Sequence, residues 1–111
     1  MTALPPGKAM EDKWFVGFYD GDCLIAVMDL ILNYPAADTA FIGLFMTDVR
    51  YQHRGMGSQI ISGLAAYLSA CGCEKIRLGV DKGNPQSHAF WTKNRFQTIG
   101  EARYIVMERE I

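Results

Sequence analysis

The sequence has few cysteines, almost no net charge and no long hydrophobic run, and each shortage argues against a class of protein. Its 111 residues include 3 cysteines, an odd number that does not suit a disulfide framework and favours a reducing, cytoplasmic environment. A formal net charge of −1 gives no electrostatic case for binding nucleic acid or a membrane surface. No apolar run approaches the ~20 residues of a membrane span, and no signal peptide is expected.

A metal-binding motif and two common phosphate-binding motifs are also missing. Cys71 and Cys73 are too close for the usual zinc pair, and no second Cys/His pair accompanies them, so no metal is expected. A Walker-type loop requires a lysine after its last glycine, and none follows Gly55 or Gly57. The dinucleotide-binding fingerprint requires a third glycine where Ile60 stands.

Apolar residues, in contrast, are plentiful. Half of the residues are hydrophobic and 12% are aromatic, which is enough for the core of one small domain. Residues 1–12 include Pro5, Pro6 and Gly7 and have no periodic apolar pattern, which predicts an N-terminal loop or tail. Residues 13–111 are expected to form a single domain.

Three consecutive strands are predicted in the first half of this domain. Residues 14–19 and 23–32 flank Asp20 and Gly21, a dipeptide that favours a hairpin turn between two β-prone segments. Residues 40–47 are mostly apolar, aromatic or β-branched, as in a buried strand. The short connections between the strands predict an antiparallel meander.

The second half predicts helices alternating with strands. Apolar residues at helical spacing predict a helix from about Arg54 to Ala70, and the strand after it should lie parallel to the strand over 40–47. The remaining predicted elements follow in order: a strand over 76–80, a short helix capped by Asn84 and running from Pro85 to about Asn94, and strands over 96–99 and 104–107. The expected fold class is a mixed α/β sheet (α+β) of about six strands with two helices.

Two glycines separated by one residue stand at the start of the longer helix. The first amides of a helix have no partner inside it and carry the positive end of its dipole. Gly55 and Gly57 allow an anion to approach these amides, and Arg54 adds a positive charge. The amides of residues 52–58 are therefore predicted to bind a phosphate or diphosphate. The alternative is a strand-to-helix turn that binds nothing.

Two segments resemble the signatures of one enzyme family. Gln52, Gly55 and Gly57 fit a Gln-x-x-Gly-x-Gly pattern, which resembles the Arg/Gln-x-x-Gly-x-Gly/Ala pyrophosphate loop of the GNAT superfamily of acyl-CoA-dependent N-acetyltransferases. Residues 84–96 resemble its second signature, Asn-x-x-Ala-x-x-Phe-Tyr-x-Lys-x-Gly-Phe. The positions in register are Asn84, Phe90, Lys93 and Phe96. The order of the predicted elements also fits, so the resemblance covers nearly the whole chain from Trp14.

The resemblance implies an acyl-CoA N-acyltransferase fold and direct transfer of an acetyl group from acetyl-CoA to a primary amine of a small molecule or protein. No metal, nucleic acid or membrane partner is expected, and association of identical copies is a further expectation. The residues expected to contact acetyl-CoA are Phe45, Met46, Thr47, Gln52, His53, Arg54, Gly55, Met56, Gly57, Ser58, Asn84, Ser87, Phe90 and Lys93. For the side chains of Phe45 and Met46, packing in the core is the alternative.

Three differences from the family pattern concern catalysis and the acceptor. The segment before the hairpin is short and lacks the strand and helices that usually help to form the acceptor site, as in a fragment, a short member or a subunit completed by a partner. Trp91 replaces the tyrosine that often protonates the departing thiolate, which an indole N–H cannot do. Arg95 replaces a glycine, which is expected to alter the local turn.

The amine acceptor must lose a proton before it attacks the thioester, so a base is needed. Asp29 is the candidate general base, because it lies among leucine and isoleucine residues where a carboxylate is unusual. A solvated aspartate at the end of a strand is the alternative. The short N-terminal segment and Trp91 keep two other functions open: a non-catalytic acyl-CoA-binding module, or an interaction subunit with an incomplete acceptor site.

Overall fold

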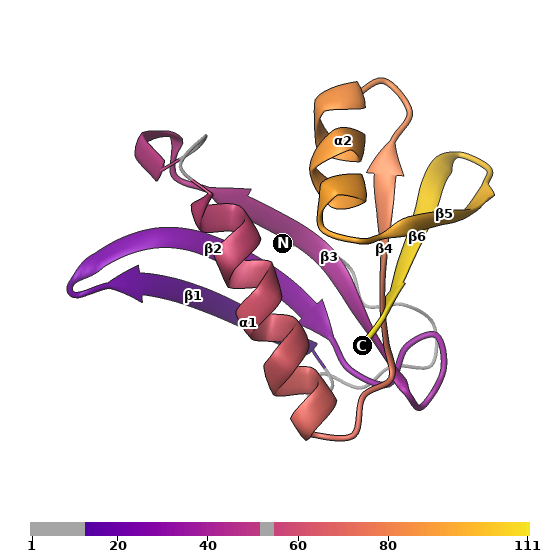
Figure 1. Ribbon diagram of the computed structural model, residues 1–111, viewed down its shortest axis with the longest axis horizontal. Helices are drawn as coiled ribbons and strands as arrows, with labels where there is room; N and C mark the ends of the chain where they lie inside the picture. Colours follow the sequence, from indigo (N-terminus) through magenta and orange to yellow (C-terminus); the bar gives the residue numbers. More distant parts are fainter. Residues whose placement is uncertain (1–12, 52–54) are drawn as a thin grey trace.

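The computed structural model describes residues 13–51 and 55–111, which form one mixed six-stranded sheet with two α-helices (Figure 1). The strand order is β1-β2-β3-β4-β6-β5. In chain order the elements are β1 (Lys13–Asp20), β2 (Cys23–Ile31), β3 (Thr39–Thr47), the 3-10 turn η2 (Val49–Tyr51), α1 (Met56–Ala70), β4 (Lys75–Asp81), α2 (Pro85–Lys93), β5 (Gln97–Glu101) and β6 (Tyr104–Glu110). The predicted fold class is confirmed.

The first three strands form the expected antiparallel meander. β1 and β2 pair from Lys13 opposite Ile31 to Asp20 opposite Cys23, so the predicted hairpin forms, but its two turn residues are Gly21 and Asp22, one position later than expected. β2 pairs antiparallel with β3 as well. Three strands joined by short connections therefore make up one half of the sheet.

β3 pairs with β4 over only part of its length, and a β-bulge lies where the pairing ends. The register between β2 and β3 shifts at Asp29 and Leu30, which leaves Gly43 as an extra residue on β3. The parallel pairing of β3 with β4 ends at Ile42 and Leu78, and the two strands diverge beyond this point (Figure 1). A bulge bends its strand and increases its twist, so the end of β3 separates from β4 while it remains paired with β2.

The core lies between the sheet and α1, with part of α2 at its edge. The strands contribute alternating residues, as expected for one face of a sheet. These residues are Met28 and Leu30 of β2, Ala40 and Ile42 of β3, Ile76, Leu78 and Val80 of β4, and Met107 of β6. α1 adds Ile61, Ala65 and Leu68 at helical spacing, and Trp91 of α2 and the following Phe96 complete the cluster.

The turn after α2 keeps a glycine-like backbone although its residue is arginine. Arg95 has φ 75, in the left-handed region that glycine favours. Such a backbone is strained for an arginine, by roughly 1–2 kcal/mol. Phe96 then enters the core, only 2% exposed.

Candidate functional site

The start of α1 is built to leave its backbone amides available. Gly55 precedes the helix with φ 75, a conformation that costs other residues roughly 1–2 kcal/mol. Among the described residues, no side chain caps this helix, and its first turn contains no acidic residue. The amides of its first turn therefore point out of the helix with the positive end of the dipole, which is an anion-binding geometry.

Gly57 has a second role that the sequence did not reveal. A Cβ atom at this position would lie 3.1 Å from Cε1 and 3.2 Å from Cζ of Phe90. Such contacts are too close for an ordinary side chain, so the absence of a Cβ allows the Phe90 ring to pack directly on the first turn of α1. Gly57 thus brings α2 close to the same helix start.

A cleft of about 590 Å³ lies where the end of β3, the start of α1 and α2 meet. It brings together the three segments that were predicted to contact the ligand. The residues that line it are Phe45, Met46, Thr47, Tyr51, Gly55, Gly57, Ser58, Asn84, Gln86, Ser87, Ala89, Phe90, Trp91 and Lys93. The divergence of β3 from β4 opens the sheet beside the cleft, next to the residues of β3 that follow the bulge.

Most of the predicted contact residues that the structure describes border this cleft. Met56 does not line it, and neither does Asp29. Gln52, His53 and Arg54 lie outside the described residues. Tyr51, Gln86, Ala89 and Trp91 line the cleft but were not among the predicted contacts. Helical spacing was the signal for the α2 residues, because positions 86, 89, 90 and 93 share one helix face.

Aromatic rings form the wall of the cleft nearest the core. Trp91 is 7% exposed, and its ring centroid lies 5.9 Å from that of Phe45, 4.9 Å from that of Phe90 and 5.1 Å from that of Phe96. Phe45 packs against the core while it also borders the cleft, as the core-packing alternative expected. This wall is thus apolar, and Asn84 and Ser87 add polar groups to the lining of the cleft.

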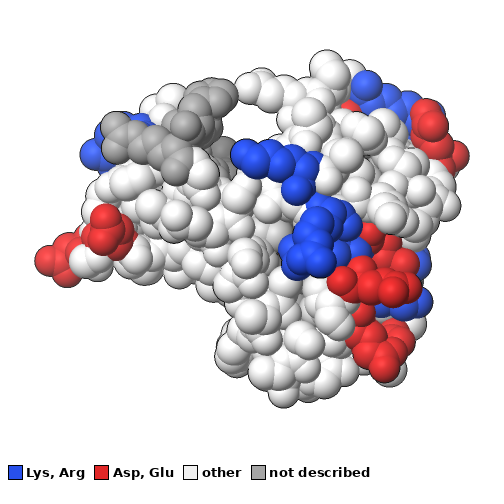
Figure 2. All heavy atoms as spheres, in the orientation of Figure 1, with Lys and Arg blue, Asp and Glu red and all other residues white. Residues whose placement is uncertain are grey.

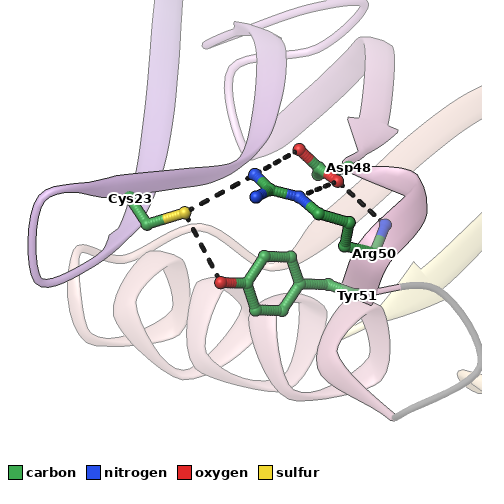
Figure 3. Close-up of polar contacts among 4 residues, drawn as sticks. All are labelled: Cys23, Asp48, Arg50 and Tyr51. Carbon is green, nitrogen blue, oxygen red and sulfur yellow. Dashed lines mark hydrogen bonds and ion pairs between the residues drawn. The ribbon is translucent and has the colours of Figure 1, made fainter.

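A polar cluster fastens the connection between β3 and α1 to the start of β2 (Figure 3). The Tyr51 hydroxyl donates to Sγ of Cys23 at 3.4 Å, and this bond raises the pKa of Tyr51. The Arg50 guanidinium donates to both carboxylate oxygens of Asp48, at 3.1 and 3.0 Å, which lowers the pKa of Asp48. Tyr51 also lines the cleft, so the cluster positions one of its walls.

Asp29 is buried but lies away from the cleft lining. It is 5% exposed, and its Oδ2 atom is 4.0 Å from Nζ of Lys13. The expected burial is therefore observed, in contrast to the alternative of a solvated aspartate. Asp29 also borders the bulge, because a Cβ atom on Gly43 would be 3.5 Å from Cβ of Asp29.

Other kinds of site find no support in the described part of the chain. Residues 13–51 and 55–111 contain no group of three or more metal-binding side chains. None of the helices within these ranges is long and apolar enough to span a membrane. The cleft with its uncapped helix start is therefore the candidate site.

Three solved structures share this fold. An acetyltransferase from Thermus thermophilus matches with a TM-score of 0.82 at 24% identity, over 92% of this chain and 66% of that one. The PaiA N-acetyltransferase of Thermoplasma acidophilum, solved with coenzyme A, gives 0.78 at 22% identity, over 90% and 62%. A Bacillus subtilis acetyltransferase in complex with CoA gives 0.74 at 17% identity, over 92% and 79%. The chain thus spans slightly less than two thirds of the first two structures.

The sequence was also compared with protein families and with curated proteins. No curated protein matched the chain. The profile of the Acetyltransferase (GNAT) family matches residues 6–96, which is most of the sequence and includes all three segments that border the cleft. Because this match covers most of the sequence, the chain belongs to the acetyltransferase (GNAT) family.

Proposed function

We propose that the cleft binds acetyl-CoA and that the chain transfers the acetyl group to a primary amine of a small molecule or protein. The observation that carries this proposal is the meeting of an uncapped helix start with a strand that has separated from its neighbour. The amides at the start of α1 suit the diphosphate. The pantetheine arm, with its two amide groups, suits the free edge of β3 over Phe45, Met46 and Thr47, as an added strand would.

The proposed reaction is a direct transfer. The neutral amine attacks the thioester carbonyl, a C–N bond forms, the C–S bond breaks, and coenzyme A leaves as its thiolate. A backbone amide of β3 beyond the bulge donates to the carbonyl oxygen, where negative charge develops. A thiol with an ordinary pKa of ~8.5 leaves readily without a proton donor, so the replacement of tyrosine by Trp91 is compatible with turnover.

Asp29 is the proposed general base. Its carboxylate is buried beside the bulge where β3 leaves β4, which supports a position near the reacting end of the pantetheine arm. Because Asp29 is outside the cleft lining, a water molecule carries the proton from the bound amine to its carboxylate. The amine's proton is taken up by this carboxylate, and the ion pair with Lys13 holds the carboxylate in place.

Two measurements test the proposed function. Calorimetry with coenzyme A tests binding, and release of free thiol from acetyl-CoA with a panel of amines tests transfer. Asp29→Asn should lower thiol release about 100-fold and leave coenzyme A affinity unchanged, because a base acts on the chemical step. Asp22→Asn, in the exposed β1–β2 turn, is the matched control. Equal rates for Asp29→Asn and the control would remove Asp29 from the mechanism.

A second candidate function is a coenzyme-binding module without turnover. Trp91 supports it, because a buried indole occupies the position of the usual proton donor. The distance of Asp29 from the cleft lining supports it as well. Tight binding of coenzyme A, with no thiol release above the buffer rate for any amine, would favour this function over the enzyme.

Two further expectations belong to this proposal. The three cysteines are free thiols, which agrees with a cytoplasmic location where acetyl-CoA is available. Association of identical copies is the proposed oligomeric arrangement, and light scattering of the purified chain measures it.

A further inference from the structure

Two arginines stand close together at the end of α2. Arg95 follows the helix, and Arg109 of β6 donates from Nη1 to the carbonyl oxygen of Asn94 at 3.3 Å. Burial is the main cause that lowers the pKa of Arg109, and the positive charge of Arg95 is the second. The two guanidinium groups therefore repel one another. Lys93 lies two residues before Arg95 and adds a third positive charge.

These three side chains have no carboxylate partner within the described ranges, 13–51 and 55–111. Other basic residues do: Arg50 pairs with Asp48, Arg77 with Glu108 and Lys82 with Glu101. Figure 2 shows Lys and Arg side chains gathered on the face that carries both helices, with Asp and Glu side chains beside them. Like charges held close together repel one another, and a bound anion would reduce that repulsion.

The cluster lies beside the helix start that the proposed diphosphate occupies. Nδ2 of Asn94 donates to Oγ of Ser58, in the first turn of α1, at 3.1 Å. This bond joins the end of α2 to the start of α1, and Lys93 itself lines the cleft. Of the three cations, Lys93 borders the cleft, and Asn94 connects Arg109 and the adjacent Arg95 to the start of α1. One N–H of Arg109 is used on the Asn94 carbonyl, and a guanidinium has five, so others can reach a ligand.

We propose that Arg95 and Arg109, with Lys93 at the cleft wall, form a subsite for the 3′-phosphate of coenzyme A. This inference rests on the proposed function. The 3′-phosphate and the diphosphate are attached to the same ribose, so a diphosphate at the start of α1 places the 3′-phosphate one sugar away, on the side where Asn94 joins α2 to Ser58. A phosphomonoester carries about −1.5 to −2 charges at neutral pH, which two or three cations neutralise. The bidentate fork of arginine matches its oxygen atoms.

The test compares coenzyme A with 3′-dephospho-coenzyme A, which differs only at this phosphate. Calorimetry on the unaltered protein should give an affinity for coenzyme A about tenfold higher, the size expected for one charge-assisted contact at a partly exposed site. Arg95→Asn removes the charge while asparagine tolerates the left-handed backbone, so folding is preserved. It should reduce the ratio of the two affinities to about twofold and leave the affinity for the dephospho ligand unchanged.

Arg103→Asn is the matched control, because Arg103 is exposed in the turn between β5 and β6 and the same charge is lost. The control should keep the tenfold ratio. Equal affinities for the two ligands in the unaltered protein would overturn the subsite and leave the proposed function standing. An equal loss for both ligands in Arg95→Asn would also overturn it, because that pattern belongs to a structural role. Failure of both ligands to bind the unaltered protein would instead refute the proposed function.

Discussion

The two helices that border the cleft begin in opposite ways. At the start of α2, Oδ1 of Asn84 accepts a hydrogen bond from the amide of Ser87 at 3.0 Å, and Pro85 occupies the first helical position. α1 begins after Gly55, with no side-chain cap among the described residues. Both starts lie at the same cleft, yet only one of them satisfies its own amides.

This difference between the two helix starts predicts the orientation of a ligand in the cleft. A capped helix start has part of its hydrogen-bonding capacity used by its own chain, and its dipole is partly compensated by the cap. An uncapped start keeps its donors for a ligand that must be anionic to bind well. An elongated ligand with a charged end and an amide-containing arm is therefore expected to place the charged end at α1 and the arm toward Asn84.

The largest expected effect tests the difference between the two helix starts, because each helix has a serine at its third position. Ser58→Asp places a carboxylate at the start of α1 and should weaken coenzyme A binding about 1000-fold, because like charges about 4 Å apart repel by roughly 4 kcal/mol at an effective dielectric constant of 20. Ser87→Asp makes the same change at α2 and should cost less than about tenfold. Calorimetry on both variants measures the difference. Equal losses would show that the diphosphate does not sit at α1.

A second test concerns the close approach of the two helices. Gly57→Ala forces a methyl group against the Phe90 ring, which Phe45 and Trp91 hold in place. Gly63→Ala makes the same change in the same helix where the added Cβ meets open space. Gly63→Ala should raise the free energy of unfolding by up to about 1 kcal/mol relative to the unaltered protein. The free energy of unfolding of Gly57→Ala should be about 2 kcal/mol lower than that of Gly63→Ala.

Urea unfolding of the two glycine variants gives both free energies of unfolding under one set of conditions. Coenzyme A affinity should fall only in Gly57→Ala, because only that methyl group borders the cleft. A Gly57→Ala variant as stable as Gly63→Ala would mean that the Phe90 ring moves aside, and Gly57 would then be kept for the ligand alone.

Local chemistry explains what could be predicted from the sequence. The β1–β2 hairpin, the cap at Asn84 and the parallel strand after α1 each depend on residues close together in the chain, and all three are confirmed, with the hairpin turn at Gly21-Asp22. The helix predicted to begin near Arg54 starts at Met56 within the described residues. Ends of helices depend on the geometry of the cap, which a residue pattern indicates only to within a few positions.

The contacts that could not be predicted join distant parts of the chain. The Phe90 ring over Gly57, the Tyr51 bond to Cys23 and the approach of Arg109 to Arg95 each join separate elements. No local pattern fixes such a pair, because the partner is chosen by how the elements pack. The predicted contact segments therefore border one cleft, whereas the contacts that join its walls could not be predicted.

The capped helix start offers a smaller test. Asn84→Ala removes the acceptor for the Ser87 amide and should destabilise the protein by about 1 kcal/mol. Asn84→Ser keeps a capping oxygen and should restore that stability. If asparagine also contacts the pantetheine arm, Asn84→Ser will still bind coenzyme A more weakly than the unaltered protein. Equal affinity would assign Asn84 to the helix cap alone.

The smallest expected effect concerns the turn that leads to the uncapped helix. Hydrogen bonds from the side chain and amide of Arg50 lower the pKa of Asp48 from its ordinary 3.8. A carboxyl with a lowered pKa in the folded state stabilises the fold above its unfolded-state pKa, and this contribution is lost as the pH falls through the folded-state value.

Asp48→Asn should therefore lower the thermal unfolding midpoint slightly at neutral pH and not at all in strong acid. High salt should shrink the difference, because the pair is exposed to solvent. A midpoint difference that persists below both pKa values would show that Asp48 acts through its uncharged hydrogen bond to the Arg50 amide, and that the turn before α1 is held by geometry and not by charge.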